Sequence, residues 1–195
     1  MVDCHIILAS NSPRRKELLS GLDIPFEVRV IEGIDESYPA SLPTQSIAEY
    51  ISRKKAMAYL AMIAPDELVI TADTVVILGD EVMGKPKDDA DACRMLHALS
   101  GRTHQVITDV TLTTRERQTS FSVETGVSFK QLSDEEIDYY VSHYHPLDKA
   151  GAYGIQEWIG HIGVTGMQGS YFNVMGLPVQ RIYEALKTFG IVPFV

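Results

Sequence analysis

The sequence predicts an α/β fold in which an elongated mixed β-sheet is flanked by helices. Strand and amphipathic-helix patterns alternate in the first half of the chain, whereas β-hairpin patterns dominate the middle. The chain has 195 residues, of which 45% are apolar, and this is enough to bury a sizeable core. We therefore expect residues 1–195 to form a single domain.

Alternating strands and helices make up the first half of the chain. Residues 5–9 form a short apolar strand. Ser12 and Pro13 then suit the N-cap and the first position of a helix that ends at Gly21. The elements expected next are a strand over 26–31, an acidic loop over 32–43, a helix over 44–64, a strand over 68–72, and a continuation over 74–78 that turns at Gly79-Asp80 into a short return strand.

The second half combines helices with a β pair. Ser133 and Glu136 have the spacing of a capping box, which predicts a helix from there to about residue 143. Residues 150–169 contain too many glycines for a regular helix. The other elements expected here are a helix over 88–99, a β pair formed by 105–113 and 120–129, and a C-terminal amphipathic helix over 178–189.

The composition limits the partners. With 17 Lys and Arg against 26 Asp and Glu, the formal net charge is −9 at pH 7, which argues against a protein that grips nucleic-acid polymers. A small anionic ligand remains compatible if local cations or a metal neutralise it. Cys4 and Cys93 have no metal-ligand spacing and indicate reduced thiols. We expect a cytoplasmic protein that needs no membrane, because no apolar run approaches the roughly 18 residues of a membrane span and no targeting pattern is present.

A first candidate site follows the first strand. Ser10 and Ser12 stand there beside Arg14, Arg15 and Lys16, at the start of a helix. Unpaired N–H groups at a helix N-terminus and the fork of arginine both suit phosphate oxygens. The alternative is a capped helix whose basic side chains are simply solvated.

A second candidate is Asp73, which comes at the end of an apolar strand, where open α/β sheets place their ligands. Its carboxylate can bind Mg²⁺ or orient a water molecule, although aspartate also forms turns at such positions. Asp35 and Glu36 add carboxylates from an exposed loop, and Lys55 adds a positive charge near the end of a predicted element.

Two further segments suit a nucleotide. Lys85 precedes a proline in the sequence GKP, which fixes its ammonium for contact with a phosphate, although the P-loop pattern is absent. The segment DKAGAYGIQ, residues 148–156, has small residues that let a ligand approach the backbone, and it ends in the amide of Gln156. An ordinary tight loop is the alternative for this segment.

Six segments taken together resemble one protein family. They are LASNSPRRKELL (8–19), TADTVV (71–76), GKP (84–86), SGRTHQVITDV (100–110), DKAGAYGIQ (148–156) and GLPV (176–179). In order and spread they are similar to the Maf family, the septum-formation-related nucleoside triphosphate pyrophosphatases. The resemblance implies an inosine-triphosphatase-like fold with two lobes around a nucleotide cleft, often in a homodimer. It also implies hydrolysis of the α–β phosphoanhydride bond of nucleoside triphosphates with a divalent cation, Mg²⁺ first and Mn²⁺ or Co²⁺ as alternatives.

The resemblance carries roles onto individual residues. Asp73 matches the acidic residue that accepts the proton from water, and Glu36 joins it as a metal ligand. Which carboxylate binds metal and which moves the proton stays open from the sequence. Lys55 and Lys85 match positions that would stabilise the leaving pyrophosphate. The motif that grips the phosphates is matched by Ser10, Arg14 and Arg15.

The resemblance extends to the base. Arg14, Thr74 and Gln156 are the residues of a branch that acts on dTTP and UTP, whereas Trp, Gln and Glu mark a branch that acts on 7-methyl-GTP. The amide of Gln156 suits the N3–H donor and the carbonyl acceptors of uracil and thymine. One departure is Glu157-Trp158, because the family commonly has small glycines after the matched glutamine.

The interpretation that follows is a dTTP and UTP pyrophosphatase that serves nucleotide pool sanitation. Two alternatives stay open. One is a pyrophosphatase with 7-methyl-GTP or purine specificity. The other is a nucleotide-binding regulator of septum formation, connected with arrest of cell division, whose turnover is incidental.

Overall fold

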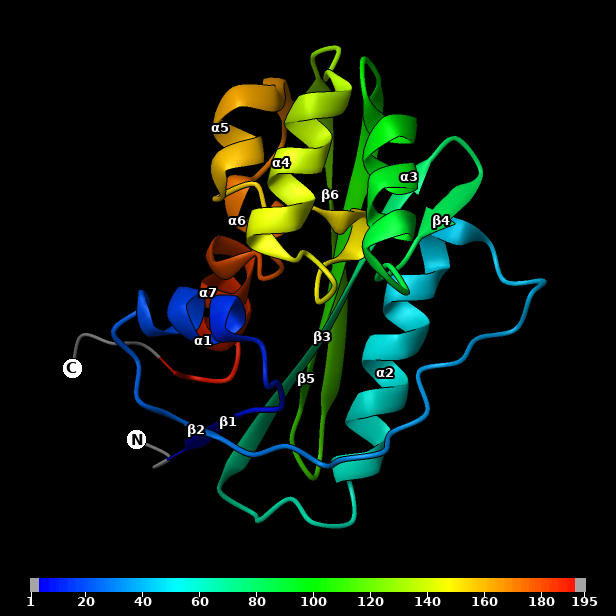
Figure 1. Cartoon of the computed structure of the whole chain (residues 1–195). Coiled ribbons are helices and arrows are strands. Elements are labelled where there is room, and N and C mark those ends of the chain that lie inside the picture. Colours follow the sequence, from blue (N-terminus) through cyan, green and yellow to red (C-terminus); the bar gives the residue numbers. More distant parts are fainter. Residues whose placement is uncertain (1–3, 192–195) are drawn as a thin grey trace. The chain divides into compact units, whose positions relative to one another are not determined.

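The computed structural model describes residues 4–191, and it confirms the predicted mixed α/β fold (Figure 1). Within the described residues, seven strands form one sheet in the order β2-β1-β3-β5-β6-β7, and β4 pairs with β3. The chain divides into two compact units. Unit 1 contains the residues up to Asp73, 108–123, and those from Gly176 onward, whereas unit 2 contains 74–107 and 124–175. The strands β3 (Glu67–Leu78), β5 (Thr103–Thr113) and β6 (Gln118–Phe129) contribute to both units.

Unit 1 is built on a parallel arrangement of three strands. β1 (His5–Leu8) pairs in parallel with β2 (Phe26–Val28) and with β3. Its core includes the fully buried side chains of Ile7, Tyr59 and Val69. The helices of this unit are α1 (Pro13–Ser20), α2 (Ile47–Tyr59) after a 3-10 turn over Thr44–Ser46, and α7 (Val179–Lys187).

Two predicted boundaries in unit 1 are wrong, one where a tertiary contact replaces the local pattern and one where turns end a helix early. The strand over 26–31 ends at Val28, because the hydroxyl of Tyr59 accepts from the Ile31 N–H at 3.0 Å and donates to the Arg29 carbonyl at 2.9 Å. The helix over 44–64 is α helical only as far as Tyr59, where turns take over. Ser12 is the N-cap of α1, as predicted, and its hydroxyl accepts from the Arg15 N–H.

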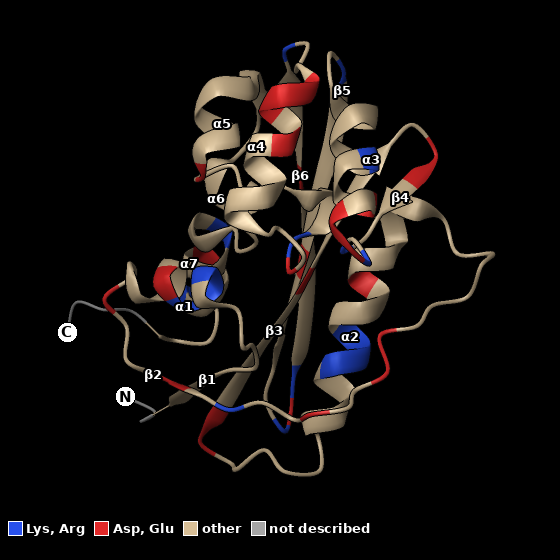
Figure 2. Ribbon diagram, viewed as in Figure 1, with Lys and Arg blue, Asp and Glu red and all other residues tan. Residues whose placement is uncertain are grey.

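Unit 2 contains the predicted hairpin, in which β4 (Glu81–Met83) runs antiparallel to the end of β3. The capping box of α4 (Asp134–Tyr144) is confirmed, since Ser133 and Glu136 bond each other's backbone. The first turn of α4 is acidic, as the clustered red residues in Figure 2 show. The remaining elements are α3 (Asp89–Leu99), a 3-10 turn over Ala150–Ala152, α5 (Trp158–Gly163), β7 (Val164–Gln168) and α6 (Tyr171–Val174).

The prediction of no regular helix over 150–169 is wrong, because α5 lies there, followed by the strand β7. A Cβ on Gly160 would overlap the Ile155 carbonyl, and one on Gly163 would lie 3.3 Å from Leu132. These glycines therefore permit close packing rather than break a helix. No helix in the described residues is long and apolar enough to cross a bilayer.

Candidate functional site

Three predicted charged residues lie together in unit 1. The Lys55 Nζ, from α2, lies 2.9 Å from Asp73 Oδ1 and 3.0 Å from Glu36 Oε1. The Asp73 and Lys55 side chains are only 12% and 13% exposed, whereas Glu36, in a loop, is 52% exposed. One ammonium therefore joins a buried carboxylate to a carboxylate on a solvent-exposed segment.

The position of Asp73 follows from where β1 ends. Asp73 lies inside β3 and not at the end of a strand, so that prediction is wrong. The strand that ends is β1, whose last residue pairs with Ile70, and the Ala9 N–H still donates to the Ile70 carbonyl at 2.9 Å. Asp73 thus lies just beyond the carboxyl end of a parallel neighbour, which is where open α/β sheets bind ligands.

Burial and charge act in opposite directions on Asp73. Burial raises the pKa of its carboxyl, while the nearby cations Lys55 and Arg15 oppose the increase. Glu36, with a like charge, adds to it. The net pKa lies above the ordinary value of an aspartate, which favours proton uptake by this group.

The loop into α1 is held by its own hydroxyls and by Arg15. The Ser10 hydroxyl accepts from the Ser12 N–H at 3.2 Å. The Arg15 guanidinium donates through Nε to the Gly176 carbonyl and through Nη1 to the Ala72 carbonyl, both at 2.8 Å. Burial lowers the pKa of Arg15, an effect that Asp73 opposes. Arg15 therefore ties the start of α1 to the residue that precedes Asp73.

In unit 2, the turn that carries Lys85 is attached to the glycine-rich loop. The Gly151 N–H donates to the Gly84 carbonyl at 3.1 Å. Gly151 has φ +70°, and a Cβ there would lie 3.0 Å from Val76, so both the backbone conformation and the packing favour glycine. Lys85 itself is exposed. The structure thus brings two of the predicted nucleotide-binding segments together.

A polar network locks the glycine-rich loop. The Lys149 ammonium is nearly buried and contacts Asp148 at 2.7 Å and Glu157 at 3.1 Å. The Tyr140 hydroxyl donates to the other oxygen of Glu157 and accepts from the Gly154 N–H at 3.0 Å. Burial, followed by Glu157, raises the pKa of Tyr140, so the phenol keeps its proton. Glu157, at which the sequence departs from the common family pattern, is thus part of a buried hydrogen-bond network with Lys149 and Tyr140.

Gln156 ends this locked loop with one unsatisfied group. Its Oε1 is buried and has no hydrogen-bond partner among the described residues. A buried acceptor without a donor costs free energy, which a ligand that supplies an N–H would recover. Trp158, the second bulky residue of the departure, starts α5 and packs on Tyr139 with ring centroids 4.8 Å apart.

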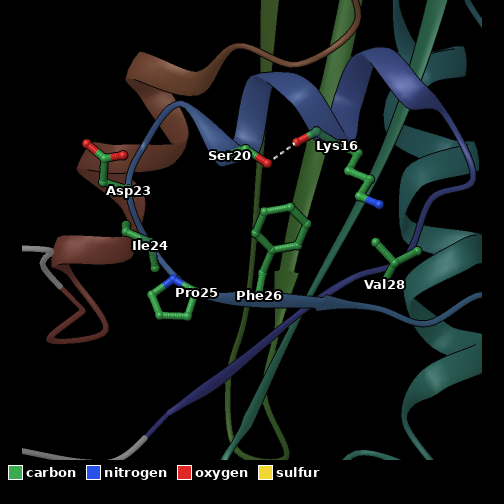
Figure 3. Close-up of a pocket in the computed structure, with 7 residues that line it drawn as sticks. All are labelled: Lys16, Ser20, Asp23, Ile24, Pro25, Phe26 and Val28. Carbon is green, nitrogen blue, oxygen red and sulfur yellow. Dashed lines mark hydrogen bonds between the residues drawn. The ribbon is translucent and has the colours of Figure 1, made fainter.

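A separate depression of about 460 Å³ lies between α1 and β2 in unit 1 (Figure 3). Its polar lining residues are Lys16, Ser20 and Asp23, and the Ser20 hydroxyl donates to the Lys16 carbonyl at 2.9 Å. Apolar side chains such as Phe26 and Val28 make up the rest of the lining. Of the basic residues predicted at the start of α1, only Lys16 lines this surface, which contains none of the residues to which the resemblance assigns a role.

The predicted residues therefore fall into two groups. In unit 1, the Lys55 ammonium contacts Asp73 and Glu36, and Arg15 bonds the Ala72 carbonyl beside Asp73. Ser10 and Arg14 also belong to unit 1, while Thr74, Lys85 and Gln156 belong to unit 2. Lys149 and Tyr140 were missed. Lys149 lies in the quoted DKAG segment, which could have drawn attention to it, whereas nothing local marks Tyr140, whose partner Glu157 is 17 residues away.

The acidic residues of unit 1 fit a divalent cation. Within residues 4–191, no group of three or more His, Cys, Asp and Glu side chains could hold a metal ion. Glu36 and Asp73 nevertheless converge, because each lies within 3.0 Å of the Lys55 ammonium. Magnesium sites at nucleotides usually need only one or two carboxylates, with phosphate and water completing the shell. Glu36 and Asp73 would supply these two carboxylates.

Comparison with known proteins agrees with the resemblance. The family model described as Maf-like protein matches residues 5–189. The chain belongs to the Maf family. A family relative named dTTP/UTP pyrophosphatase from Phocaeicola vulgatus is 64% identical over 93% of this chain and 94% of the relative. Another of that name, from Porphyromonas gingivalis, is 54% identical over 95% and 94%. A HAM1 protein from Coxiella burnetii aligns over 95% of this chain and 99% of its own with a TM-score of 0.46 at 17% identity.

Proposed function

We propose that this Maf protein is a nucleoside triphosphate pyrophosphatase that hydrolyses dTTP and UTP to the monophosphate and pyrophosphate. The observation that carries the proposal is the buried Asp73–Lys55 pair with Glu36 beside it. It supplies a base, a cation and a metal ligand within one small volume. The relatives named dTTP/UTP pyrophosphatase support the choice of substrates.

Asp73 is the proton acceptor of the proposed reaction. A water molecule attacks the α-phosphorus, and its oxygen forms a new bond to phosphorus as the bond to the bridging oxygen breaks. The water proton passes to the Asp73 carboxylate, whose raised pKa suits this transfer. The electron pair of the broken bond leaves with pyrophosphate.

Lys55 neutralises the charge that develops on the leaving group. In the structure its ammonium is already engaged by two carboxylates, and the approach of a phosphate provides a competing partner. Positive charge directed at the leaving oxygen lowers the barrier more than it stabilises bound substrate. We assign Lys85, Ser10, Arg14 and Arg15 to further phosphate contacts, with Arg15 acting mainly through the backbone carbonyls that it holds.

A divalent cation completes this proposal. Glu36 and Asp73 would hold it, and Mg²⁺ is the first choice, with Mn²⁺ and Co²⁺ as alternatives. When bound, the cation would offset the negative charge of the triphosphate, which an acidic protein otherwise repels.

Gln156 is the proposed reader of the base. Its unsatisfied Oε1 would accept the N3–H of uracil or thymine, and its NH₂ group would donate to a neighbouring carbonyl. Thr74 and Arg14 complete the proposed specificity set. A purine with adjacent N–H donors would leave the NH₂ group of Gln156 unpaired, which disfavours it.

The decisive experiment measures pyrophosphate release by the purified protein with Mg²⁺ from dTTP, UTP, CTP, GTP and 7-methyl-GTP. We expect dTTP and UTP to have the highest kcat/KM. If no nucleotide releases pyrophosphate, the proposal fails, and if a purine has the highest value, the purine alternative replaces it.

The physiological role needs a second measurement. We propose a cytoplasmic homodimer that sanitises the nucleotide pool and requires neither a nucleic-acid polymer nor a membrane. Cells carrying Asp73→Asn should lose the phenotype of the wild-type gene together with the activity. A retained phenotype would instead favour the regulator of septum formation.

A further inference from the structure

A buried polar cluster joins α2 to the sheet in unit 1. Its members are one carboxylate and five hydroxyl groups: Asp109 and Thr111 on β5, Ser120 and Ser122 on β6, Thr71 on β3 and Ser52 on α2. Asp109, Thr111, Thr71 and Ser52 are fully buried. A helix normally packs on a sheet through apolar side chains, and a buried carboxylate is costly unless it is hydrogen-bonded. The proposed reaction does not use this cluster.

Hydroxyl groups satisfy the Asp109 carboxylate. Ser122 donates to its Oδ2 at 2.8 Å, while Ser120 and Thr111 donate to its Oδ1 at 3.2 and 3.4 Å. An ionised carboxylate can only accept, so it sets the direction of the hydroxyls around it. With the Thr111 hydrogen directed at Asp109, the Thr111 oxygen is left to accept from Ser52, which lies 2.8 Å away.

The same chain of hydroxyls fixes α2 on β3. The Thr71 hydroxyl donates to the Ser52 carbonyl at 2.9 Å, and the Ser52 hydroxyl lies 3.4 Å from the Thr71 carbonyl. Because the single Ser52 hydrogen is directed at Thr111, the bond from Thr71 to the Ser52 carbonyl joins α2 to β3, while the Ser52 hydroxyl joins the same helical residue to β5. This point defines the longitudinal position of α2 relative to β3.

Next to this point, the same two elements present the catalytic pair. Lys55 follows Ser52 by one helical turn, and Asp73 follows Thr71 by two residues on the same face of the strand. Any slide of α2 along β3 would change the 2.9 Å contact between Lys55 and Asp73. Well-oriented catalytic groups lose rate steeply when displaced by about 1 Å.

We propose that Asp109 is a positioning residue: through the hydroxyls of Thr111 and Ser52 it fixes α2 against β5, the neighbour of β3 in the sheet, and so holds the Lys55 ammonium on Asp73. The functional consequence rests on the proposed pyrophosphatase reaction. Asp109 itself does not touch the substrate in this proposal.

A double-mutant cycle between Thr111 and Lys55 tests the proposal. Thr111→Val keeps the shape and removes the hydroxyl, so we expect kcat for dTTP to fall about tenfold with KM unchanged within about twofold. Thr111→Ser restores the hydroxyl and the rate. In a Lys55→Met background, Thr111→Val should cost less than about twofold, because the group on which it acts is gone. Additive effects would overturn the proposal.

The control is Thr113→Val, at a buried threonine on the same strand whose hydroxyl accepts from Gln118 at 3.0 Å. It should leave kcat within about twofold of wild type. Asp109→Asn should lower kcat for dTTP, as Thr111→Val does. If the Asp109→Asn protein does not fold, the comparison of Thr111→Val with Thr111→Ser still decides the outcome.

A second readout does not depend on activity. Lys55 should be acylated by acetic anhydride several-fold faster in Thr111→Val than in wild type or Thr111→Ser, as measured by mass spectrometry, because its ammonium no longer stays on Asp73. Equal labelling of Lys55 in all three proteins would refute the positioning role. A wild type that labels as expected and yet releases no pyrophosphate would refute the proposed function alone.

Discussion

The two units treat their buried polar groups differently. In unit 1, the Lys55 ammonium is shared between buried Asp73 and exposed Glu36, so its partners can change when a phosphate arrives. In unit 2, Lys149, Glu157 and Tyr140 satisfy one another around Gly154, and within this loop the buried Gln156 Oε1 has no hydrogen-bond partner among the described residues. The first arrangement suits groups that exchange partners in a reaction. The second suits a fixed surface that discriminates between ligands.

The largest expected effect comes from breaking the unit 1 arrangement at Asp73. Asp73→Asn keeps the volume but cannot take a proton, so kcat for dTTP should fall about 10³-fold, within the range of general-base losses. Initial rates of pyrophosphate release measure this. Cooperative thermal unfolding of the variant would separate the loss from misfolding, and a kcat within tenfold of wild type would contradict the assigned role.

The next effect belongs to Lys55, and its neighbour Lys54 is a matched control. Lys55→Met should lower kcat about 10²-fold, because the leaving pyrophosphate loses a directed cation. Lys54 pairs instead with Asp35 at 2.8 Å, in an exposed ion pair. Lys54→Met should leave kcat within about twofold, because exposed ion pairs contribute little. Equal losses in the two variants would mean that the general charge of α2 matters and not the Lys55 contact.

In unit 2, the matching test changes the side-chain amide of Gln156, which carries the unsatisfied acceptor. Gln156→Glu removes the NH₂ donor while keeping the length of the side chain, and kcat/KM for dTTP and UTP should fall about 10²-fold. The readout is the ratio of kcat/KM for UTP to that for GTP. An unchanged ratio would remove Gln156 from base recognition and leave the unit 1 chemistry untouched.

Tyr140→Phe tests whether the hydrogen bonds of Tyr140 to Glu157 and Gly154 contribute to both stability and substrate selectivity. The variant leaves Glu157 and the Gly154 N–H without their shared partner, which should lower the free energy of unfolding by about 1–3 kcal/mol. The same variant should reduce the preference for UTP over CTP more than it reduces kcat. Urea titration and substrate competition measure the two effects, and a selectivity equal to that of wild type would make the network a purely structural device.

The sequence correctly predicted the structural features that depend on residues close together in the chain. The caps at Ser12 and Ser133 formed as predicted, because a cap depends on residues within one turn. The length of β2 and the presence of α5 were mispredicted, since a Tyr59 hydroxyl and the close approach of Gly160 to Ile155 decide them. Such contacts between residues distant in sequence leave no periodic pattern.

In the candidate site, too, some residues could be predicted from the sequence and others could not. The residue types and the motif resemblance predicted Asp73, Lys55 and Glu36, and the structure places the Lys55 ammonium within hydrogen-bonding distance of both carboxylates. Asp109 lies inside the quoted segment SGRTHQVITDV, but its importance depends on hydroxyls from other strands, such as Ser122. The supporting groups therefore could not be predicted from the sequence, because their role exists only once the strands are paired.

The smallest effect concerns His104 in unit 2, whose ring bonds the Tyr153 hydroxyl at 2.7 Å and whose Nδ1 is buried without a partner among the described residues. Burial lowers the pKa of His104 to about 4, whereas the unfolded chain keeps about 6.5. Between these values the unfolded chain binds more protons, so the stability from neutral His104 is complete above about pH 6.5 and is lost as the pH falls toward 4.

His104→Gln removes this titration, and the comparison with wild type isolates it. Asp73 and Asp109 in unit 1 have raised pKa values, so their contribution has the opposite sign and is common to both proteins. Between pH 7 and pH 5, wild type should therefore lose about 2 kcal/mol more in the free energy of unfolding than the variant does. Urea titrations at the two pH values measure the difference. Equal losses in the two proteins would mean that His104 takes up its proton without unfolding, and that unit 2 is less rigid around Tyr153 than its buried contacts indicate.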